Sequence, residues 1–216
     1  ARGEPAGQPS GRHSGAAPAV LALAAWIAVL GGGAAAGYFS TEESGERPAL
    51  EAAASDWNVQ DGTLSISLVQ MGSEVTGSFA DWTAAISFEP QDAPGKAGEV
   101  EVTISVPSLT LGSVTSQALG PDFFAASKFP TASFRADIVN AADGYEAQGT
   151  LSLKGAEMPV TLPFTLTLDG DTAEMQGRTM LDRRNYGIGD NMADPGQLSF
   201  EVEVLIDLTA TRSDGT

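Results

Sequence analysis

Apolar and polar residues alternate from Trp57 onward, and this alternation constrains the fold more than any other feature of the chain. In the stretch TLSISLVQ, Leu64, Ile66 and Leu68 fall on one face, with serines between them. A period of two residues is the signature of a half-buried β-strand. The same alternation recurs in eight further segments: EVTGSF, WTAAISFEP, EVEVTISV, TASFRADIV, TLSLKG, VTLPFTLTL, TAEMQGRTML and LSFEVEVLIDLTA. The pattern predicts an all-β domain of about eight or nine strands.

The lengths of these strands favour a closed barrel. Segments of about eight to twelve residues exceed the usual strand length of about 5–6 residues. Long antiparallel strands that close on themselves leave no exposed edge. We therefore expect an extended eight-stranded antiparallel barrel, with a β-sandwich as the alternative. Turn signals occur at Asp143-Gly144 and Asp169-Gly170, and only Val114–Ala126 has room for a short helical link.

Residues 16–39, AAPAVLALAAWIAVLGGGAAAGYF, carry no charge over 24 positions, enough for a helix to cross a bilayer. The segment also resembles the hydrophobic region of a signal peptide, with small residues at Ala34-Ala35-Ala36 as a cleavage site. Trp26, Tyr38 and Phe39 favour a retained anchor with an interfacial end. We expect a transmembrane helix, and a cleaved signal is the alternative. Both interpretations place the β-domain outside the cytoplasm.

The chain is thus expected to have five parts. They are a flexible tail (1–15), the transmembrane helix (16–39), an acidic linker (40–55), the barrel (56–211) and a C-terminal tail (212–216). Because the sequence starts at Ala1 rather than Met, we expect a processed chain or a part of a longer one.

Charge and composition exclude several functions. The net charge is −17, and residues 41–216 alone carry nine basic and 27 acidic side chains. Such a surface repels nucleic acid, so no nucleic-acid partner is expected. There is no cysteine, and the only histidine, His13, lies in the tail. Disulfides, thiolate or histidine metal sites, histidine-ligated haem and Ser-His-Asp triads are therefore excluded from the β-domain.

Carboxylates leave one enzymatic alternative. Asp182 with Asp190, or Glu201 with Glu203, has the composition of a glycosidase pair. Chance pairs are plentiful among so many acids, and the acidic stretches 169–171 and 189–194 lack the spacing of a calcium loop. We expect a binding protein without a metal rather than a carboxylate-dependent hydrolase.

The stretch LGPDFFAASKFPTASF, residues 119–134, holds four of the nine phenylalanines: Phe123, Phe124, Phe129 and Phe134. They are suited to plug one end of a hydrophobic core or to form the wall of an apolar ligand site. Both roles remain open on the residues alone.

Several motifs follow one another in a familiar order: WNV (from Trp57), VTGSF (Val75), EVTISVPSL (Glu101), LGPDFFAASKFPTASF (Leu119), GTLSLKG (Gly149), PVTLPFTL (Pro159) and RRNYGIG (Arg183). Over residues 56–211 they resemble the YceI-like family. The most specific motif is D-F-F-x-x-x-x-F-P-x-x-x-F, here Asp122 to Phe134. The second is R-x-D-F-G-x-G, where this chain has Arg183, Asn185, Tyr186, Gly187 and Gly189.

The resemblance implies a periplasmic, lipocalin-like barrel that binds polyisoprenoid chains, including isoprenoid quinones. The expected ligand-binding residues are Ile66, Leu68, Phe79, Ile104, Leu119, Phe123, Phe124, Phe129, Phe134, Leu153, Phe164, Arg183 and Tyr186. For Arg183, a salt bridge and a hydrogen bond to a quinone carbonyl or phosphate are the two expected roles. Tyr186 is either a ring in the wall or a hydroxyl donor.

The chain departs from the family pattern at several places. Leu64 and Leu68 stand where the family has Ser and Phe, Thr115-Ser116 replaces an Arg-Asp pair, and Asn185-Tyr186 replaces Asp-Phe. These positions include polar ones that could meet a head group. The resemblance therefore predicts the fold and leaves the ligand's identity open.

Some members of the family are fused behind a bacterial di-haem b-type cytochrome of the inner membrane, and residues 1–39 resemble the tail and extra helix after such a module. We therefore expect a module in the bacterial periplasm, anchored to the inner membrane, that serves as a lipid carrier, a sensor or a quinone-presenting partner of a b-type cytochrome. A structural or interaction β-domain whose own side chains fill the barrel is the alternative.

Overall fold

The computed structural model describes residues 49–50, 55–141 and 143–213. The predicted tail (1–15), the predicted transmembrane helix (16–39) and most of the predicted linker (40–55) lie outside these residues. Within the described ranges, no helix is long and apolar enough to span a membrane.

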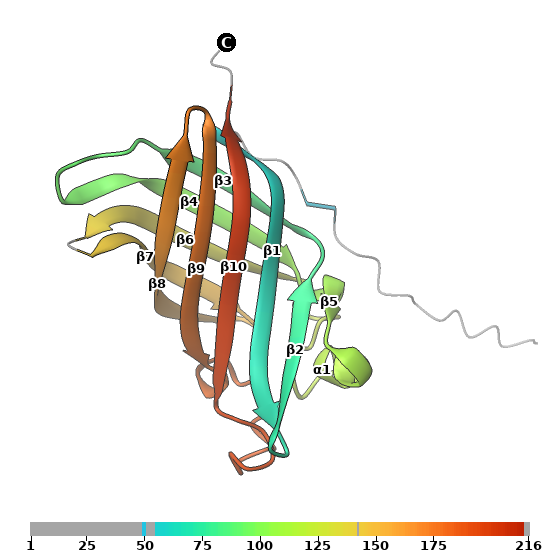
Figure 1. Ribbon diagram of the computed structural model, residues 1–216. Helices are drawn as coiled ribbons and strands as arrows, with labels where there is room; N and C mark the ends of the chain where they lie inside the picture. The colour runs from blue at the N-terminus through green and yellow to red at the C-terminus, as the bar shows by residue number, and fades with distance from the viewer. Residues whose placement is uncertain (1–48, 51–54, 142, 214–216) are drawn as a thin grey trace, which may run out of the picture. The chain divides into compact units, whose positions relative to one another are not determined.

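Ten strands and a few short helical turns make up the fold (Figure 1). The strands are β1 (Trp57–Gln70), β2 (Ser73–Phe79), β3 (Trp82–Phe88), β4 (Gly95–Ser105), β5 (Leu109–Thr110), β6 (Thr131–Ala141), β7 (Gly144–Leu153), β8 (Ala156–Asp169), β9 (Thr172–Asp182) and β10 (Glu201–Arg212). The helical turns are η1 (Val106–Ser108), η2 (Gly112–Val114), α1 (Thr115–Ala118) and η3 (Arg183–Tyr186).

Eight of the strands close into an antiparallel barrel, in the order β1–β10–β9–β8–β7–β6–β4–β3. The pairing of β1 with β10 is long, from Trp57 opposite Arg212 to Ser67 opposite Glu203. The return from β3 to β1 is a single pair, Trp57 opposite Ile86. The predicted eight-stranded barrel is thereby confirmed, and the sandwich alternative is wrong.

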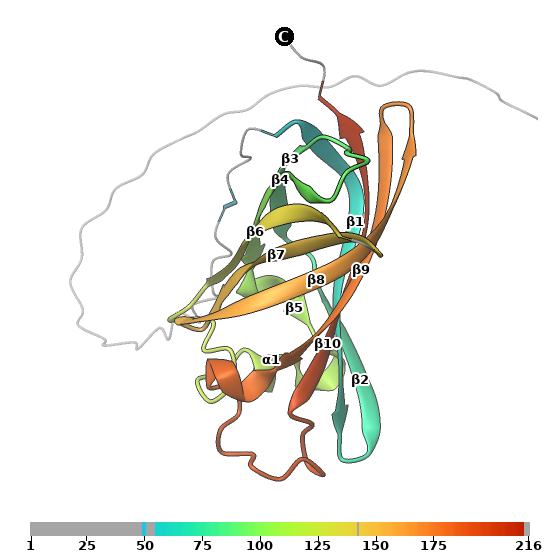
Figure 2. The same ribbon diagram turned by 90° about the vertical axis from the view of Figure 1, so that its left-hand side faces the viewer.

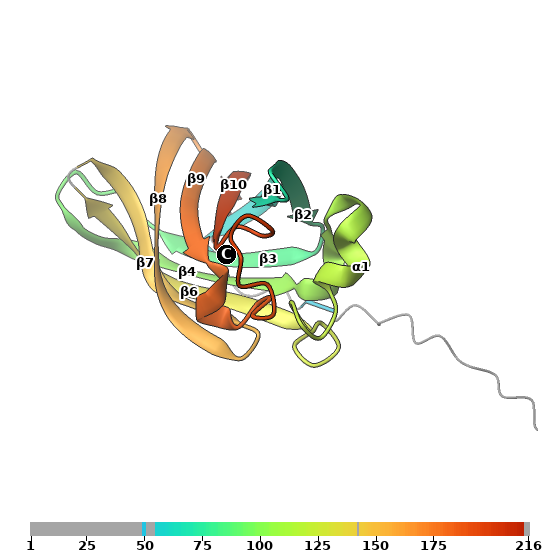
Figure 3. The same cartoon turned by 90° about the horizontal axis from the view of Figure 1, so that it is seen from below.

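Beyond this pair, β1 exchanges its neighbour β3 for β2. The β1–β2 hairpin runs from Leu64 opposite Phe79 to Gln70 opposite Ser73, and β2 also pairs with β5. The predicted helical link is present as η2 and α1, followed by turns up to β6. In the view from below (Figure 3), the segment after β9 lies across the near end of the barrel, with α1 to one side.

Tight turns set the strand register. Met71 and Gly72 have φ values of 49° and 78°, and Lys154 and Gly155 have 51° and 80°. Positive φ at both central residues is the geometry of a two-residue hairpin whose twist matches that of its strands. Each hairpin therefore holds its alternating apolar residues on the inner face.

The inward face of the strands forms the core. At the end where β10 finishes, Trp57 is 2% exposed and its indole N–H donates to the carbonyl of Phe88 over 3.0 Å. Phe88, Ala97, Ile138, Ala173 and Ala210 pack around Trp57. Small and large side chains together close this end of the barrel, and the larger cavity lies toward the other end.

Candidate ligand cavity

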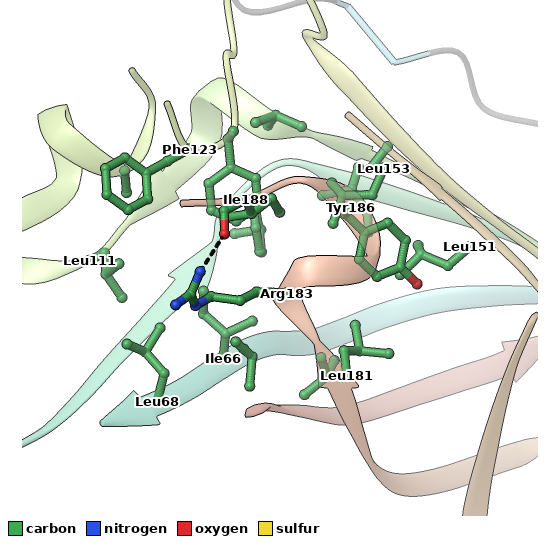
Figure 4. A pocket seen from close by; sticks show the side chains of 18 of the residues that line it. Ile66, Leu68, Leu111, Phe123, Leu151, Leu153, Leu181, Arg183, Tyr186 and Ile188 are labelled. Carbon is green, nitrogen blue, oxygen red and sulfur yellow. Dashed lines mark hydrogen bonds between the residues drawn. The ribbon is translucent and has the colours of Figure 1, made fainter. Parts of the chain in front are cut away.

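A cavity of about 190 Å³ lies inside the barrel toward the end that holds α1 and η3 (Figure 4). Its walls come from inward-facing residues of β1, β2, β4 and β6 to β10, together with α1 and the segment after η3. The polar members of the lining are Gln70, Gln117, Thr179, Arg183, Tyr186 and Ser199. Apolar cavities of about 150 Å³ stay dry and accept benzene, so this space suits an apolar group.

A second apolar cavity, of about 100 Å³, continues the interior toward the other end of the barrel. Trp57 and Trp82 line it together with Phe88. Five residues line both cavities and form the partition between them: Leu64, Val102, Phe134, Leu162 and Ile206. Together the two cavities approach the lower bound, about 300 Å³, of ordinary small-molecule sites.

The most exposed part of the lining marks the mouth. Gln117 on α1 is exposed, and Gln70, Val75 and Ser199 are partly exposed. The β1–β2 hairpin and the segment after η3 extend beyond the barrel at this same end (Figures 1 and 2). Two backbone bonds join them, from Met71 N–H to the Gln197 carbonyl (3.0 Å) and from Ser199 N–H to the Val69 carbonyl (2.8 Å).

Most of the residues expected to bind a ligand line the larger cavity. These are Ile66, Leu68, Phe79, Ile104, Phe123, Phe124, Phe134, Leu153, Arg183 and Tyr186. Phe164 lines the second cavity instead. Leu119 and Phe129 line neither, although Leu119 packs beside Phe124 in the buried cluster around Ala126. Ligand contact itself stays a prediction for all of them.

The four phenylalanines of the opening stretch have different surroundings. Phe134 points inward from β6, and Phe124 meets Phe79 edge to face with ring centres 6.2 Å apart. Phe129 packs at the β7–β8 turn, where a Cβ on Gly155 would lie 2.9 Å from its ring. The Lys128 ammonium lies 5.1 Å from the centre of the Phe129 ring. Phe123, Phe124 and Phe134 are thus wall residues, and Phe129 supports the turn.

Arg183 makes no salt bridge with the described residues, and its N–H donors are bound to the backbone instead. Its side chain is 4% exposed, and its guanidinium donates to five backbone carbonyls, those of Ser199 (2.9 Å), Ile188 (2.8 Å), Gly189 (2.7 Å), Met192 (2.5 Å) and Leu198 (3.2 Å). Figure 4 shows one of these bonds. A guanidinium has five N–H donors, so all are used. Burial lowers the pKa of Arg183, an effect that Asp182 and Asp190 partly offset.

The Tyr186 ring is part of the cavity wall, and a donor role for its hydroxyl stays a prediction. Its ring is 4% exposed and packs with Phe134, Leu151 and Leu162. Its hydroxyl makes no hydrogen bond to any residue that the structure describes. Burial raises the pKa of Tyr186, so the hydroxyl keeps its proton at neutral pH. The cavity wall therefore contains an unused donor.

Several lining residues were missed by the sequence analysis, notably Val202, Val204 and Ile206 on β10, and Ile188 and Leu198 in the segment after η3. The alternation of apolar and polar residues along β10 could have identified Val202, Val204 and Ile206 as inward-facing. Ile188 and Leu198 lie in an irregular segment, where no periodicity shows which side chain turns inward.

The candidate carboxylate pairs lie elsewhere. The Arg184 guanidinium binds both carboxylate oxygens of Asp182, and this contact lowers the pKa of Asp182. Glu203 pairs with Arg178 over 3.2 Å, and Glu201 and Glu203 alternate with the cavity-lining Val202 and Val204. Both glutamates therefore face away from the cavity. Across residues 55–141 and 143–213, no acidic or histidine group of three or more is placed to hold a metal ion.

Comparisons with known proteins agree with this architecture. The YceI-like domain family matches residues 54–210. The crystal structure of Burkholderia cenocepacia BcnA superposes with a TM-score of 0.64 at 30% identity, over 69% of this chain and 96% of that one. A UPF0312 protein of Pseudomonas aeruginosa is 30% identical over 145 residues, which are 63% of this chain and 73% of that protein.

A polyisoprenoid binding domain from Saccharophagus degradans, implicated in plant cell wall breakdown, has the same fold. Its TM-score is 0.56 at 17% identity, over 73% of this chain and 99% of that one. Because the family match spans nearly the whole barrel, the chain belongs to the YceI-like family.

Proposed function

We propose that this chain binds an isoprenoid lipid, a polyprenoid or an isoprenoid quinone, inside its barrel. The observation that carries the proposal is the apolar cavity that continues as a second cavity behind a thin partition. Each buried CH₂ of a lipid tail contributes about 0.8 kcal/mol, and the ordering of the tail offsets part of this gain. The similarity in fold to a polyisoprenoid binding domain supports the same ligand class.

The test is to identify lipids that co-purify with the protein. Organic extraction of the native chain, followed by mass spectrometry, should yield about one isoprenoid per protein. A Val204→Phe variant should lose this lipid because Val204 lines the cavity. The matched control is Leu205→Phe. Leu205 follows Val204 on β10, and its side chain therefore faces the outer surface. Wild-type protein without co-purifying lipid would refute the proposal.

The two other candidate functions have weaker support. A structural β-domain with a filled core calls for a tightly packed interior, and this barrel holds two cavities. A carboxylate-dependent hydrolase needs two acids at its substrate site, and Asp182 is held by Arg184 while Glu201 and Glu203 face outward. Lipid binding is therefore the function that we carry forward.

We further place this domain in the bacterial periplasm, tethered to the inner membrane by residues 16–39. The uncharged stretch of 24 residues supports this placement. After a carbonate wash the protein should stay in the membrane fraction and should keep the residues before Ala16. A soluble periplasmic product that begins near Gly37 would instead establish a cleaved signal peptide.

Within that setting, the module would carry a lipid or present quinone to a b-type cytochrome. A carrier should move quinone between two populations of vesicles at a rate that rises with protein concentration. A presenting module should leave that transfer unchanged and accelerate the reduction of the membrane cytochrome by quinol. If lipid-loaded protein neither transfers quinone between vesicles nor accelerates the reduction of the cytochrome, both roles are refuted.

A further inference from the structure

Tyr186 lines the larger cavity, and its hydroxyl, which protein atoms do not fully enclose, makes no hydrogen bond to any described residue. The other polar groups of the lining are occupied or lie at the mouth. Thr179 donates to the Thr161 carbonyl (3.0 Å), and Ser199 donates to the Glu201 carbonyl (2.8 Å). Gln70 and Gln117 lie where the cavity meets solvent.

The surroundings of the Tyr186 hydroxyl are apolar. A buried hydroxyl without a partner destabilises a folded protein. Phe134, Leu151 and Leu162 surround the Tyr186 ring and offer no side-chain acceptor. A ligand that brings an oxygen atom would supply one.

The described lining of the same cavity offers no free cationic N–H donor. Arg183 is the only charged residue of the lining, and backbone carbonyls take all five of its N–H donors. A phosphate placed beside Tyr186 would therefore find no free N–H donor on Arg183, and its remaining oxygens would be buried without hydrogen-bond partners, which is unfavourable. The interior therefore suits an oxygen acceptor without charge.

We propose that the cavity selects an uncharged isoprenoid bearing a carbonyl or hydroxyl oxygen, and that Tyr186 donates a hydrogen bond to this oxygen. The inference rests on the proposed isoprenoid binding and assigns its polar contact. The oxygen-bearing end then lies inside the barrel, beside Tyr186 and Leu151 (Figure 4), and not at the mouth beside Gln117.

The test uses four probes that share one phytyl chain: phytane, phytol, phylloquinone and phytyl phosphate. Their affinities are measured for the delipidated full chain, for Tyr186→Phe and for the control Tyr145→Phe. Tyr145 is a suitable control because its hydroxyl contacts Gln91 and is not part of the larger cavity. Melting temperatures without ligand check that each variant folds.

We expect Tyr186→Phe to bind phytane as the wild type does and to lose about two- to tenfold in affinity for phylloquinone and phytol. Tyr145→Phe should keep the wild-type ratios, and phytyl phosphate should bind at least about tenfold more weakly than phytol. The carbonyl stretching frequency of phylloquinone should fall on binding to the wild type and should not fall in Tyr186→Phe.

Each outcome has its own meaning. If the wild type binds none of the phytyl compounds, the proposed function itself fails. If all bind, but Tyr186→Phe leaves the phylloquinone-to-phytane ratio and the carbonyl frequency unchanged, the role of Tyr186 fails and isoprenoid binding stands. If phytyl phosphate binds as tightly as phytol, the selection against charge is wrong.

Discussion

Arg183 stabilises an irregular segment by collecting its carbonyl groups around one cation. The carbonyls come from Ile188, Gly189, Met192, Leu198 and Ser199, all in the segment between η3 and β10. That segment has no long strand neighbour to donate hydrogen bonds to these carbonyls. Bonds from an ionised donor are stronger than neutral ones, so a single side chain replaces a sheet partner here.

Replacement of Arg183 should therefore cost much more than replacement of its neighbour. Arg183→Met leaves buried carbonyls without donors, and we expect a loss of about 3 kcal/mol in the free energy of unfolding. Arg183→Lys should recover only part of this, because an ammonium cannot reach five acceptors. Arg184→Met breaks a solvent-exposed pair with Asp182, and it should therefore cost clearly less than Arg183→Met.

Denaturant unfolding of the three variants checks this prediction. Equal losses for Arg183→Met and Arg184→Met would show that the carbonyl contacts contribute little to stability.

Tyr186 gives the protein a specific sensitivity to alkali. Burial raises the folded-state pKa of Tyr186 above the ordinary value of about 10. Below pH 10 the residue is protonated in both states and adds no pH dependence. As the pH rises past 10, only the unfolded chain ionises, so stability falls until the folded-state pKa is reached.

Tyr186→Phe should remove this loss. The difference in unfolding free energy between wild type and variant should be constant from pH 7 to 9 and should shift in favour of the variant above about pH 10. Denaturant melts at a series of pH values measure the difference, and Tyr145→Phe serves as the comparison. A difference that does not change with pH would mean that the Tyr186 hydroxyl is ionised as readily in the folded protein as in the unfolded one.

At the scale of elements, the phenylalanines in the link between β5 and β6 have two different structural roles. Phe124 lines the cavity and contacts Phe79, whereas Phe129 packs under the β7–β8 turn at Gly155. A residue that faces a ligand has part of its contact area with the ligand. Its truncation should therefore cost less in the empty protein than truncation of a fully packed Phe, which costs about 3–5 kcal/mol.

We expect Phe124→Ala to keep most of the melting temperature of the empty protein and to lose most of the stabilisation that added isoprenoid quinone provides. Phe129→Ala should do the reverse, with a lower melting temperature and an unchanged ligand-induced shift. Thermal unfolding with and without quinone tests both. Equal ligand-induced shifts in the two variants and in the wild type would mean that the link is only a plug.

The alternation of residues predicted the strands well because each strand has one face in the barrel and one in solvent. It failed where the ladder is irregular. The alternation begins at Trp57, where β1 also starts, but it does not show the register shift between Val59 and Asp61. Gly62 is also required there, since a Cβ would lie 2.7 Å from the Trp82 ring. A bulge and a close approach between strands leave no periodic signal.

The candidate site was predictable to the same extent. Inward positions such as Ile66 and Leu153 follow from alternation, and both line the cavity. The carbonyl partners of Arg183 and the unpaired hydroxyl of Tyr186 depend on how an irregular segment folds back. Nothing in residue order encodes that path, so sequence reasoning assigned Arg183 to a head group or a salt bridge.

At the scale of the whole barrel, the interior is two cavities in line rather than one. The partition between them draws one residue from each of five strands: β1, β4, β6, β8 and β10. Leu162 on β8 is the most deeply buried of the five partition residues, with 4% of its surface exposed. A lipid tail that outgrows the first cavity must either extend through the mouth or displace such a residue to reach the second cavity.

Chain length should therefore limit affinity, and the limit should move when the partition is opened. For the wild type, affinity should rise from geraniol to farnesol and then level off at geranylgeraniol, because the gain of about 0.8 kcal/mol per buried CH₂ ends where the first cavity is full. Leu162→Ala should extend the rise to geranylgeraniol, at a cost of about 2–5 kcal/mol in the stability of the empty protein. Leu166→Ala, on the same face of β8, lines only the second cavity and should leave the wild-type limit in place.

Tryptophan emission reports the position of the tail, because Trp57 and Trp82 line only the second cavity. In a Trp26→Phe background, geranylgeraniol should shift the emission of the Leu162→Ala variant and leave that of the Leu166→Ala control nearly unchanged. If geranylgeraniol already shifts the wild-type emission and affinity rises without levelling, Leu162 is no barrier. A long tail would then pass through both cavities in the native barrel.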